Sequence, residues 1–326
     1  MRIVIVGAGA VGGYMAGMLA RAGADVVMLA RGANLAAIRE RGLAIQTRAD
    51  RWTVPVTVSD DTGALGAVDL AVVTAKAPAL PGLAELMQPM LRPDTPVVCA
   101  MNGIPWWYEY GRAGGTGAPL IRVDPDGAIW QGIGPARAIG CVIDCPTREV
   151  VPGEVHHVGP YPGMFHLGEP KGGASARLAE VVNAIEAGGM SAPIRDDIRA
   201  AIWAKLLVNV SRSPLGVLTG ATERALAENA DTCAVTLAIM HEARAVARSH
   251  GIEVHVDEAS NRDPAKRSEH RSSMLQDWDL GRPMEIDGIV RVVQDFARGA
   301  DIATPTLDTV AALLIEKARV AGTYEG

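Results

Sequence analysis

A glycine-rich turn near the amino terminus constrains the fold of this chain more than any other feature. Residues 2–6 (RIVIV) form a short apolar, β-branched run that predicts a buried parallel strand. Residues 11–22 have helical spacing, and residues 25–30 (DVVMLA) predict a second buried strand. A β-α-β unit fits this order, and such crossovers are right-handed. The glycine-rich turn joins the first strand to the helix, with the sequence Gly7-Ala8-Gly9-Ala10-Val11-Gly12.

Each glycine of this turn has a physical role. Gly7 permits the tight passage from strand to helix, Gly9 lets a pyrophosphate approach the backbone, and Gly12 lets the helix pack close to the sheet. The helix N-terminus adds free N–H groups and the positive end of the helix dipole. A tight turn without a ligand is the alternative. The position between a strand and a helix favours a dinucleotide site formed by Gly7, Ala8, Gly9, Ala10, Val11 and Gly12.

The end of the second predicted strand distinguishes two dinucleotides. An acidic residue there binds the ribose 2′-hydroxyl of NAD, but this strand ends Leu29-Ala30-Arg31-Gly32. The Arg31 guanidinium is able to form paired hydrogen bonds to a 2′-phosphate. An ordinary surface arginine is the alternative. The sequence therefore favours NADP(H) as the cofactor, and some use of NAD stays open.

The rest of the chain predicts two domains. Alternating strands and helices continue to about residue 196, with long helical periodicities after it, so we expect a Rossmann-type α/β domain at 1–196 and an all-helical domain at 197–326. Further strands are predicted at 69–74, 97–101 and 137–143, paired strands at 43–48 and 52–58, and a hairpin of 149–158 with 164–168. Helices are predicted at 80–91, 175–187, 197–211, 231–249, 286–298 and 306–320.

Composition excludes several classes of protein. The net charge of -6, without a lysine or arginine cluster, argues against a nucleic-acid partner. The four cysteines form no CxxC pair or zinc pattern, and we expect no metal site. His156 and His157 are strand neighbours that point to opposite faces, so they are not expected to share a metal. Glycines interrupt the apolar N-terminus, and no apolar run is long enough to span a bilayer, so a cytoplasmic protein without a membrane partner is expected.

The helical half carries two groups of polar residues in apolar surroundings. Lys205 and Asn209 lie four apart in residues 202–210 (IWAKLLVNV), so they share a helix face. Lys205 either extends to the surface along its apolar stem or donates a proton to a substrate oxygen. Glu285 and Asp287 either mark a solvated helix start or belong to a site. Periodicity alone leaves both choices open.

Several motifs together resemble the ketopantoate reductase (2-dehydropantoate 2-reductase) family along essentially the whole chain. Their order and spacing are specific, although no single motif would be. The matching residues are the glycine turn with Gly13, then Arg31, Thr74-Ala75-Lys76, Asn102-Gly103, Asp197, Trp203-Ala204-Lys205-Leu206-Leu207-Val208-Asn209, Ser272-Ser273-Met274-Leu275-Gln276-Asp277 and Glu285-Ile286-Asp287.

The resemblance implies a two-domain reductase with its active site in the interdomain cleft, where NADPH gives hydride to the ketone carbon of a small 2-oxo acid. It implies that Lys205 is the general acid and that Glu285 holds the far hydroxyl of the substrate and helps to orient Lys205. Asn209 would hydrogen-bond the substrate and Ser273 its carboxylate. A homodimer rests on the resemblance alone. The residues implied to line the nicotinamide and ribose side are Asn102 and Lys76.

The chain departs from the family pattern in ways that concern the substrate. Met101 precedes Asn102 where the family often has Gln, and Ser213 stands where a second substrate-contacting asparagine is often found. The segment after Asn102 is longer than is usual for the family, and residues 106–130 are rich in Trp and Tyr. This segment is either a lid, a wall of the substrate site or a packed element. Two alternatives to ketopantoate reduction therefore remain: the same chemistry on a bulkier 2-oxo acid, with Ser213 in the substrate site, and a non-catalytic NADP(H)-binding sensor.

Overall fold

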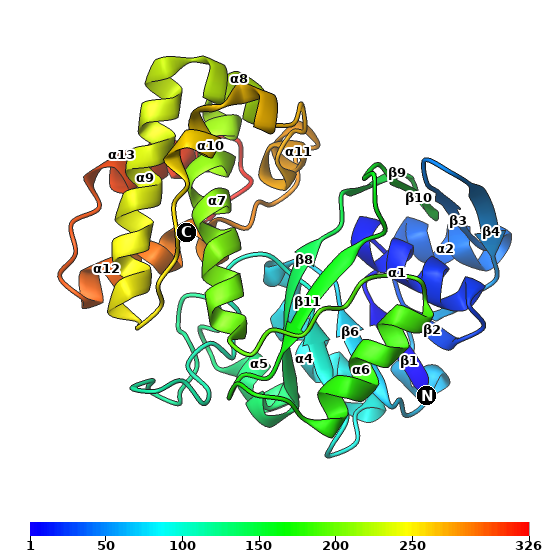
Figure 1. Cartoon of the computed structure of the whole chain (residues 1–326). Helices are drawn as coiled ribbons and strands as arrows, with labels where there is room; N and C mark the ends of the chain where they lie inside the picture. Colours follow the sequence, from blue (N-terminus) through cyan, green and yellow to red (C-terminus); the bar gives the residue numbers. More distant parts are fainter. Residues whose placement is uncertain (326) are drawn as a thin grey trace. The chain divides into compact units, whose positions relative to one another are not determined.

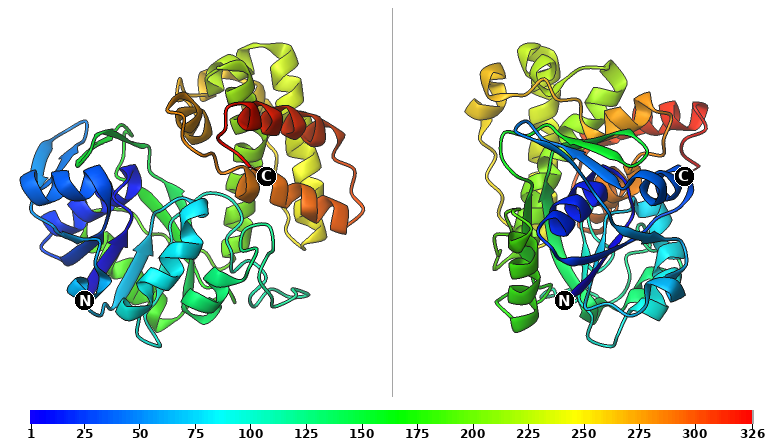
Figure 2. Two further views of the ribbon diagram at one scale, coloured as in Figure 1. Left: turned by 180° about the vertical axis from the view of Figure 1, so that it is seen from behind. Right: turned by 90° about the vertical axis from the view of Figure 1, so that its right-hand side faces the viewer.

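The chain folds as two compact units, and the computed structural model describes residues 1–325. The first unit comprises Met1–Met101 and Pro105–Ile198, and the second comprises Asn102–Ile104 with the chain from Arg199 onward. The first is an α/β unit and the second is helical, which confirms the predicted fold class (Figures 1 and 2). The periodicity of the sequence gives no sign that the tripeptide 102–104 packs with the helical unit.

A seven-stranded sheet forms the centre of the first unit, in the order β11-β8-β7-β6-β1-β2-β5. Neighbouring strands run parallel except β11, which is antiparallel to β8. Helices on both faces of a parallel sheet explain why these strands are almost continuously apolar. The predicted β-α-β opening is confirmed. The strands are β1 (Arg2–Val6), β2 (Asp25–Leu29), β5 (Thr57–Ser59), β6 (Leu70–Val73), β7 (Val97–Cys99), β8 (Ala138–Asp144) and β11 (Met164–Gly168).

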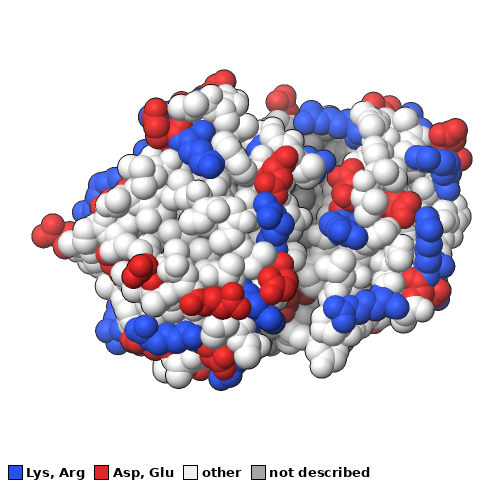
Figure 3. All heavy atoms as spheres, turned by 90° about the horizontal axis from the view of Figure 1, so that it is seen from above, with Lys and Arg blue, Asp and Glu red and all other residues white. Residues whose placement is uncertain are grey.

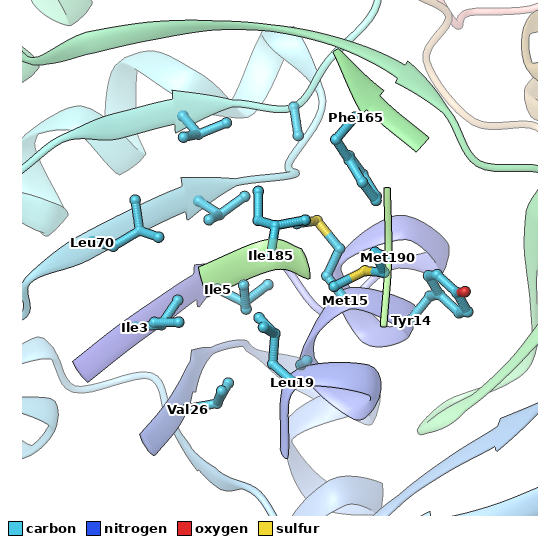
Figure 4. Packing of buried hydrophobic residues seen from close by; sticks show 14 of the residues in the cluster. Ile3, Ile5, Tyr14, Met15, Leu19, Val26, Leu70, Phe165, Ile185 and Met190 are labelled. Carbon is cyan, nitrogen blue, oxygen red and sulfur yellow. The ribbon is translucent and has the colours of Figure 1, made fainter. Parts of the chain in front are cut away.

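Helices α1 (Ala10–Arg21) and α6 (Ala176–Ala187) cover one face of this sheet. Figure 4 shows Leu19 of α1 and Ile185 of α6 in one buried cluster with Ile5 of β1. Each such side chain removed from water contributes about 1.5–3 kcal/mol, so this layer holds α1 firmly behind the glycine turn. Further elements of the unit are α2 (Gly32–Arg41), α3 (Thr62–Leu65), α4 (Leu80–Met87), α5 (Ala128–Ile133) and the 3-10 turns η1 (Ala77–Ala79), η2 (Gln88–Met90) and η3 (Pro135–Arg137).

A second, four-stranded sheet corrects two strand predictions. Its order is β4-β3-β10-β9, formed by β3 (Leu43–Gln46), β4 (Arg51–Val54), β9 (Thr147–Val151) and β10 (Glu154–His157). The predicted pairing of 43–48 with 52–58 holds only as far as Val54, because the chain is interrupted at Pro55 and β5 then pairs with β2.

The predicted hairpin of 149–158 with 164–168 is wrong. Strand β10 pairs with β9 and β3, whereas β11 pairs with β8 in the main sheet. The physical reason is the turn at Gly153, whose φ of 78° lets the chain reverse between β9 and β10 within the predicted single strand. The Gly159–Gly163 segment is thereby a connection between two sheets.

The second unit is built from helices, and no strand occurs in its described part, up to residue 325. Glu242 of α9 accepts hydrogen bonds from the backbone N–H groups of Thr306 and Leu307, at 3.0 and 2.8 Å, and so caps the N-terminus of α13. The helices are α7 (Ile198–Thr219), α8 (Glu223–Glu228), α9 (Ala230–Ser249), α10 (Glu258–Arg262), α11 (Ser273–Asp279), α12 (Val292–Gly299) and α13 (Pro305–Val320), with the 3-10 turn η4 (Pro264–Lys266) and the π-helical turn η5 (Asp287–Arg291).

The aromatic segment after Asn102 is a packed element at its start. Trp106, Trp107 and Tyr108 are at most 2% exposed. The indole N–H of Trp106 donates to the Cys99 sulfur at 3.2 Å, and Trp130 packs edge-on against Trp106 at 6.2 Å. Burial raises the pKa of the Cys99 thiol to about 11. Trp106–Tyr108 therefore form a packed element and not a lid, because rings buried in the core are not available to close over a site.

Acidic and basic side chains are interspersed on the face of the molecule shown in Figure 3. Over residues 1–325, no group of three or more His, Cys, Asp and Glu side chains is arranged to hold a metal ion. Within the same residues, no helix is both long and apolar enough to cross a membrane.

His157 stacks on Tyr14 with ring centroids 4.7 Å apart, and burial of His157 lowers the pKa of its imidazole.

Candidate active site

The glycine turn has the geometry that a phosphate site requires. Gly7 follows β1 with φ of 106°, and its N–H donates to the Leu29 carbonyl at 3.0 Å. Helix α1 begins at Ala10, with Gly9 at its N-cap position and no side-chain cap from residues 1–325. Across the same described residues, apart from Gly9 and its two chain neighbours, no heavy atom lies within 4 Å of a Cβ placed on Gly9. The helix N-terminus therefore offers open N–H groups beside a free approach to the backbone.

Gly12 has a different role from Gly9. A Cβ on Gly12 would lie 2.0 Å from the Gly7 carbonyl oxygen and 2.3 Å from Thr74 Oγ1. The third glycine of the motif thus serves contact between helix and strand, as the sequence predicts, while Gly9 leaves space for a ligand.

Alanine at these two positions is expected to separate folding from dinucleotide binding. Gly9→Ala should change the free energy of unfolding by less than about 1 kcal/mol, because the backbone there suits an L-residue, yet weaken NADPH binding about tenfold or more. Gly12→Ala should lower stability by about 1–3 kcal/mol through overpacking. Thermal unfolding and fluorescence titration with NADPH measure the two effects. Unchanged NADPH affinity in Gly9→Ala would contradict a phosphate at this turn.

Thr74 braces the turn from the neighbouring strand. It follows β6, and its Oγ1 lies 3.2 Å from the Val6 carbonyl oxygen and 3.0 Å from the Gly7 carbonyl oxygen. The hydroxyl thus ties the end of β6 to the end of β1. In the sequence Thr74 is recognisable only as part of a motif, Thr74-Ala75-Lys76, which does not predict this role. The sequence signal for this role is a hydroxyl side chain directly after a buried apolar strand, where a polar side chain needs a hydrogen-bond partner.

Removing this hydroxyl is expected to weaken dinucleotide binding. Thr74→Val keeps the shape but loses the hydrogen bonds to the Val6 and Gly7 carbonyls, so NADPH affinity should fall about fivefold, equivalent to about 1 kcal/mol. Thr74→Ser keeps the hydroxyl and is the matched control, with affinity close to that of the unchanged chain. Titration calorimetry measures both. Equal affinities in the two variants would show that the hydroxyl does not support the turn.

The carboxyl ends of adjacent parallel strands bring the cofactor candidates to one sheet edge. Strands β6, β1 and β2 are neighbours, and they are followed by Lys76, the glycine turn and Arg31 respectively. The chain turns to opposite sides of β1 to form β2 and β6, which makes this edge a topological switch point, where α/β sheets bind ligands. Arg31 is exposed and, within residues 1–325, makes no side-chain hydrogen bond or ion pair. Lys76 is partly buried at the N-cap of η1.

Helix α7 carries a row of the predicted substrate residues. Lys205, Asn209 and Ser213 are spaced by four, so each is displaced by only about 40° around a helix of 3.6 residues per turn. Lys205 and Asn209 are partly buried, and Ser213 is 4% exposed. Trp203 is wholly buried and packs against Phe296 of α12 at 6.3 Å between ring centroids. This anchored aromatic ring fixes the rotation of α7 about its axis, and with it the direction of the row.

The structure brings Asn102 and Glu285 together within the helical unit. The Asn102 amide nitrogen lies 3.5 Å from Glu285 Oε2, at the outer limit of a hydrogen bond. Next to them, the N–H of Ile104 donates to the Gly288 carbonyl at 2.8 Å. Asn102 and Glu285 are 183 positions apart in the chain, and this spacing gives no indication of the contact.

Ser273 lies at the start of α11, where its neighbour has the capping role. The Ser272 hydroxyl accepts from the Leu275 N–H at 3.2 Å, whereas Ser273 is the exposed first residue of the helix. A Cβ on Gly216 of α7 would lie 3.6 Å from Ser272 Oγ. The start of α11 is thus packed near Gly216, one helical turn beyond Ser213.

Comparison with known proteins identifies the family of both units. Family models match in two parts, ketopantoate reductase PanE/ApbA over residues 3–172 and its C-terminal part over residues 197–318. A 2-dehydropantoate 2-reductase of Mesorhizobium japonicum is 41% identical over 327 residues, covering 99% of this chain and 100% of the relative.

Solved structures share the fold over its whole length. A candidate ketopantoate reductase from Ralstonia solanacearum MolK2 superposes with a TM-score of 0.92 at 38% identity, covering 99% of each chain. D-mandelate dehydrogenase, solved with NADH and anilino(oxo)acetate, has a TM-score of 0.84 at 22% identity and covers 99% of this chain and 100% of its own, which shows the fold alone. The glycine turn, the α7 row and these matches over both units agree: this chain belongs to the ketopantoate reductase PanE/ApbA family.

Proposed function

We propose that this chain reduces 2-dehydropantoate to pantoate with NADPH, a reductive step toward pantothenate and coenzyme A. The observation that carries the proposal is full-length similarity, at 41% identity, to a 2-dehydropantoate 2-reductase, in a chain that keeps Lys205, Asn209 and Glu285. In this proposal residues 1–196 bind the dinucleotide, and residues 197–326 carry the catalytic groups. Asn102 would act together with those catalytic groups.

The residues at the first sheet edge fit a nicotinamide dinucleotide phosphate. Open space at Gly9 and the uncapped start of α1, which receives no side-chain cap from residues 1–325, suit a pyrophosphate. Arg31 would pair with the 2′-phosphate, since arginine binds phosphate oxygens in pairs. Lys76 and Asn102 would line the ribose and nicotinamide side. When bound, NADPH supplies the hydride.

The chemical roles of the helical unit follow from charge. Reduction of a 2-oxo acid places negative charge on the former ketone oxygen, and the Lys205 ammonium would donate a proton there. Glu285 would accept a hydrogen bond from the far hydroxyl of the substrate and help to orient Lys205. Asn209 and Ser273 would donate hydrogen bonds to the substrate, the latter to its carboxylate.

Ser213 favours a second candidate, the same reduction of a bulkier 2-oxo acid. It is buried on α7, four residues after Asn209, and its side chain is small. A smaller side chain at a substrate-facing position would leave room for a larger substrate. We also propose a homodimer, which rests on the family resemblance alone, and a cytoplasmic location, which rests on the apolar pattern of the sequence.

The test is NADPH oxidation, followed at about 340 nm, with purified protein and a panel of 2-oxo acids. Fastest turnover of 2-dehydropantoate supports the first candidate, and faster turnover of a larger 2-oxo acid supports the second. Tight NADPH binding without turnover of any member would overturn both and favour a non-catalytic sensor.

A further inference from the structure

The tripeptide Asn102–Ile104 packs with the helical unit although its chain neighbours belong to the α/β unit. The chain leaves the first unit after Met101 and returns to it at Pro105. Ile104 is 3% exposed, so its backbone N–H requires a partner. That partner is the Gly288 carbonyl oxygen, at 2.8 Å.

The Gly288 carbonyl is available because the helix around it is wound as a π turn. In an α-helix this carbonyl would accept the N–H of Val292, four residues on. Here the N–H of Val292 bonds to the Asp287 carbonyl, five residues back, and η5 spans Asp287–Arg291. The wider turn thus shifts the hydrogen-bond pattern by one residue and leaves Gly288 to bind Ile104. Such turns are rare and are frequent at functional sites.

Gly103 makes the close approach possible. Its φ is 84°, and a Cβ on it would lie 2.4 Å from the Gly288 carbonyl oxygen, which is backbone and has little freedom to move. On one side of this contact is Asn102, and three residues before Gly288 is Glu285. The Asn102 amide nitrogen and Glu285 Oε2 lie 3.5 Å apart. The backbone clamp therefore fixes the two main chains from which these side chains extend.

We propose that Gly103 and Gly288 are positioning residues of the reductase: the π turn releases the Gly288 carbonyl to hold Ile104, and this clamp keeps Asn102 on Glu285. The inference rests on the proposed function, in which both side chains act on cofactor and substrate. It adds that their placement depends on a backbone contact between two glycines. A misplacement of about 1 Å of such groups lowers turnover by about a hundredfold.

Hydrogen exchange tests the clamp without any activity measurement. In the unchanged chain, NMR should show the Ile104 amide proton exchanging at least about a hundredfold more slowly than an unstructured amide, as a buried and bonded group does. Fast exchange of this proton would overturn the clamp whatever the enzyme does.

Gly103→Ala tests its consequence, with Gly251→Ala as the matched control. Gly251 has φ of 75°, so alanine is strained there too, but among the described residues no heavy atom beyond its chain neighbours lies within 4 Å of its Cβ position. We expect Gly103→Ala to speed exchange at Ile104 and lower kcat about 10–100-fold, with NADPH affinity changed less than threefold. Gly251→Ala should change neither exchange nor kcat, whatever its effect on stability. Equal kcat losses in the two variants would overturn the proposal.

A double-mutant cycle separates positioning from general loosening. If Gly103 acts through Asn102, Gly103→Ala in an Asn102→Ala background should lower kcat by less than about threefold, whereas independent effects would multiply. Multiplying losses would overturn the proposal. These measurements presuppose that the unchanged chain turns over a 2-oxo acid. If it turns over none, the proposed function has failed while the exchange experiment still decides on the clamp.

Discussion

Replacing Lys205 by alanine is expected to lower kcat about 10²–10⁴-fold, the usual contribution of a well-placed general acid. The substrate oxygen gains negative charge as hydride arrives, and without an ammonium group its proton must come from water. Lys205 is the eighth residue of α7, and the buried Trp203 two residues earlier fixes its direction. The change should leave NADPH affinity within about threefold. Steady-state kinetics and NADPH titration together measure this.

Lys266→Ala is the matched control, because Lys266 is an exposed lysine at the end of η4 in the same helical unit. It removes the same charge and should leave kcat unchanged. Turnover by Lys205→Ala at the rate of the control would remove Lys205 from the mechanism. A loss of NADPH affinity as large as the loss of kcat would show instead that Lys205 serves the cofactor.

Replacing Arg31 by alanine is expected to weaken NADPH binding about 10–100-fold and to spare NADH. Arg31 is exposed at the end of β2, and no other side chain among residues 1–325 pairs with it. Its hydrogen bonds to a 2′-phosphate would contribute about 1.5–3 kcal/mol, whereas NADH has no phosphate at this position. Titration with the two dinucleotides gives the ratio directly.

Arg41→Ala controls for loss of positive charge from the same helix. Arg41 is exposed at the far end of α2, and its contact is with the Pro152 carbonyl at 3.5 Å. It should weaken NADPH binding less than twofold, because screened charges separated by a helix length interact weakly. Equal losses for NADPH and NADH in Arg31→Ala would mean that the arginine does not recognise the 2′-phosphate.

The sequence predicted those parts of this protein that depend on interactions between residues close together in the chain. The glycine turn was predictable because strand, tight turn and helix follow one another within 22 residues, and each glycine answers a steric demand of its neighbours. The row Lys205, Asn209 and Ser213 was predictable because helical periodicity places residues four apart on one face. The long helices of the second unit follow from the same period.

Strand pairing was less predictable from local sequence. The sequence predicts residues 149–158 as one strand, yet Gly153 divides them into β9 and β10, and β10 pairs in parallel with β3, more than 100 residues earlier. A strand pairs through backbone groups that every residue carries, so sequence predicts that a segment is extended but not which strand it joins. The aromatic residues 106–108 were ambiguous for a related reason, because only tertiary packing distinguishes a core ring from a lid.

The sequence by itself determined the fold class, the glycine turn between β1 and α1, and the row on α7. Only the tertiary structure decided that Thr74 braces the turn, that Asn102 meets Glu285, and that Gly103 contacts Gly288. These contacts join residues 67 to 185 positions apart, two of them through backbone carbonyl oxygens and the third between the side chains of Asn102 and Glu285. Such interactions leave no period or motif in the chain, because they depend on where two main chains meet in space.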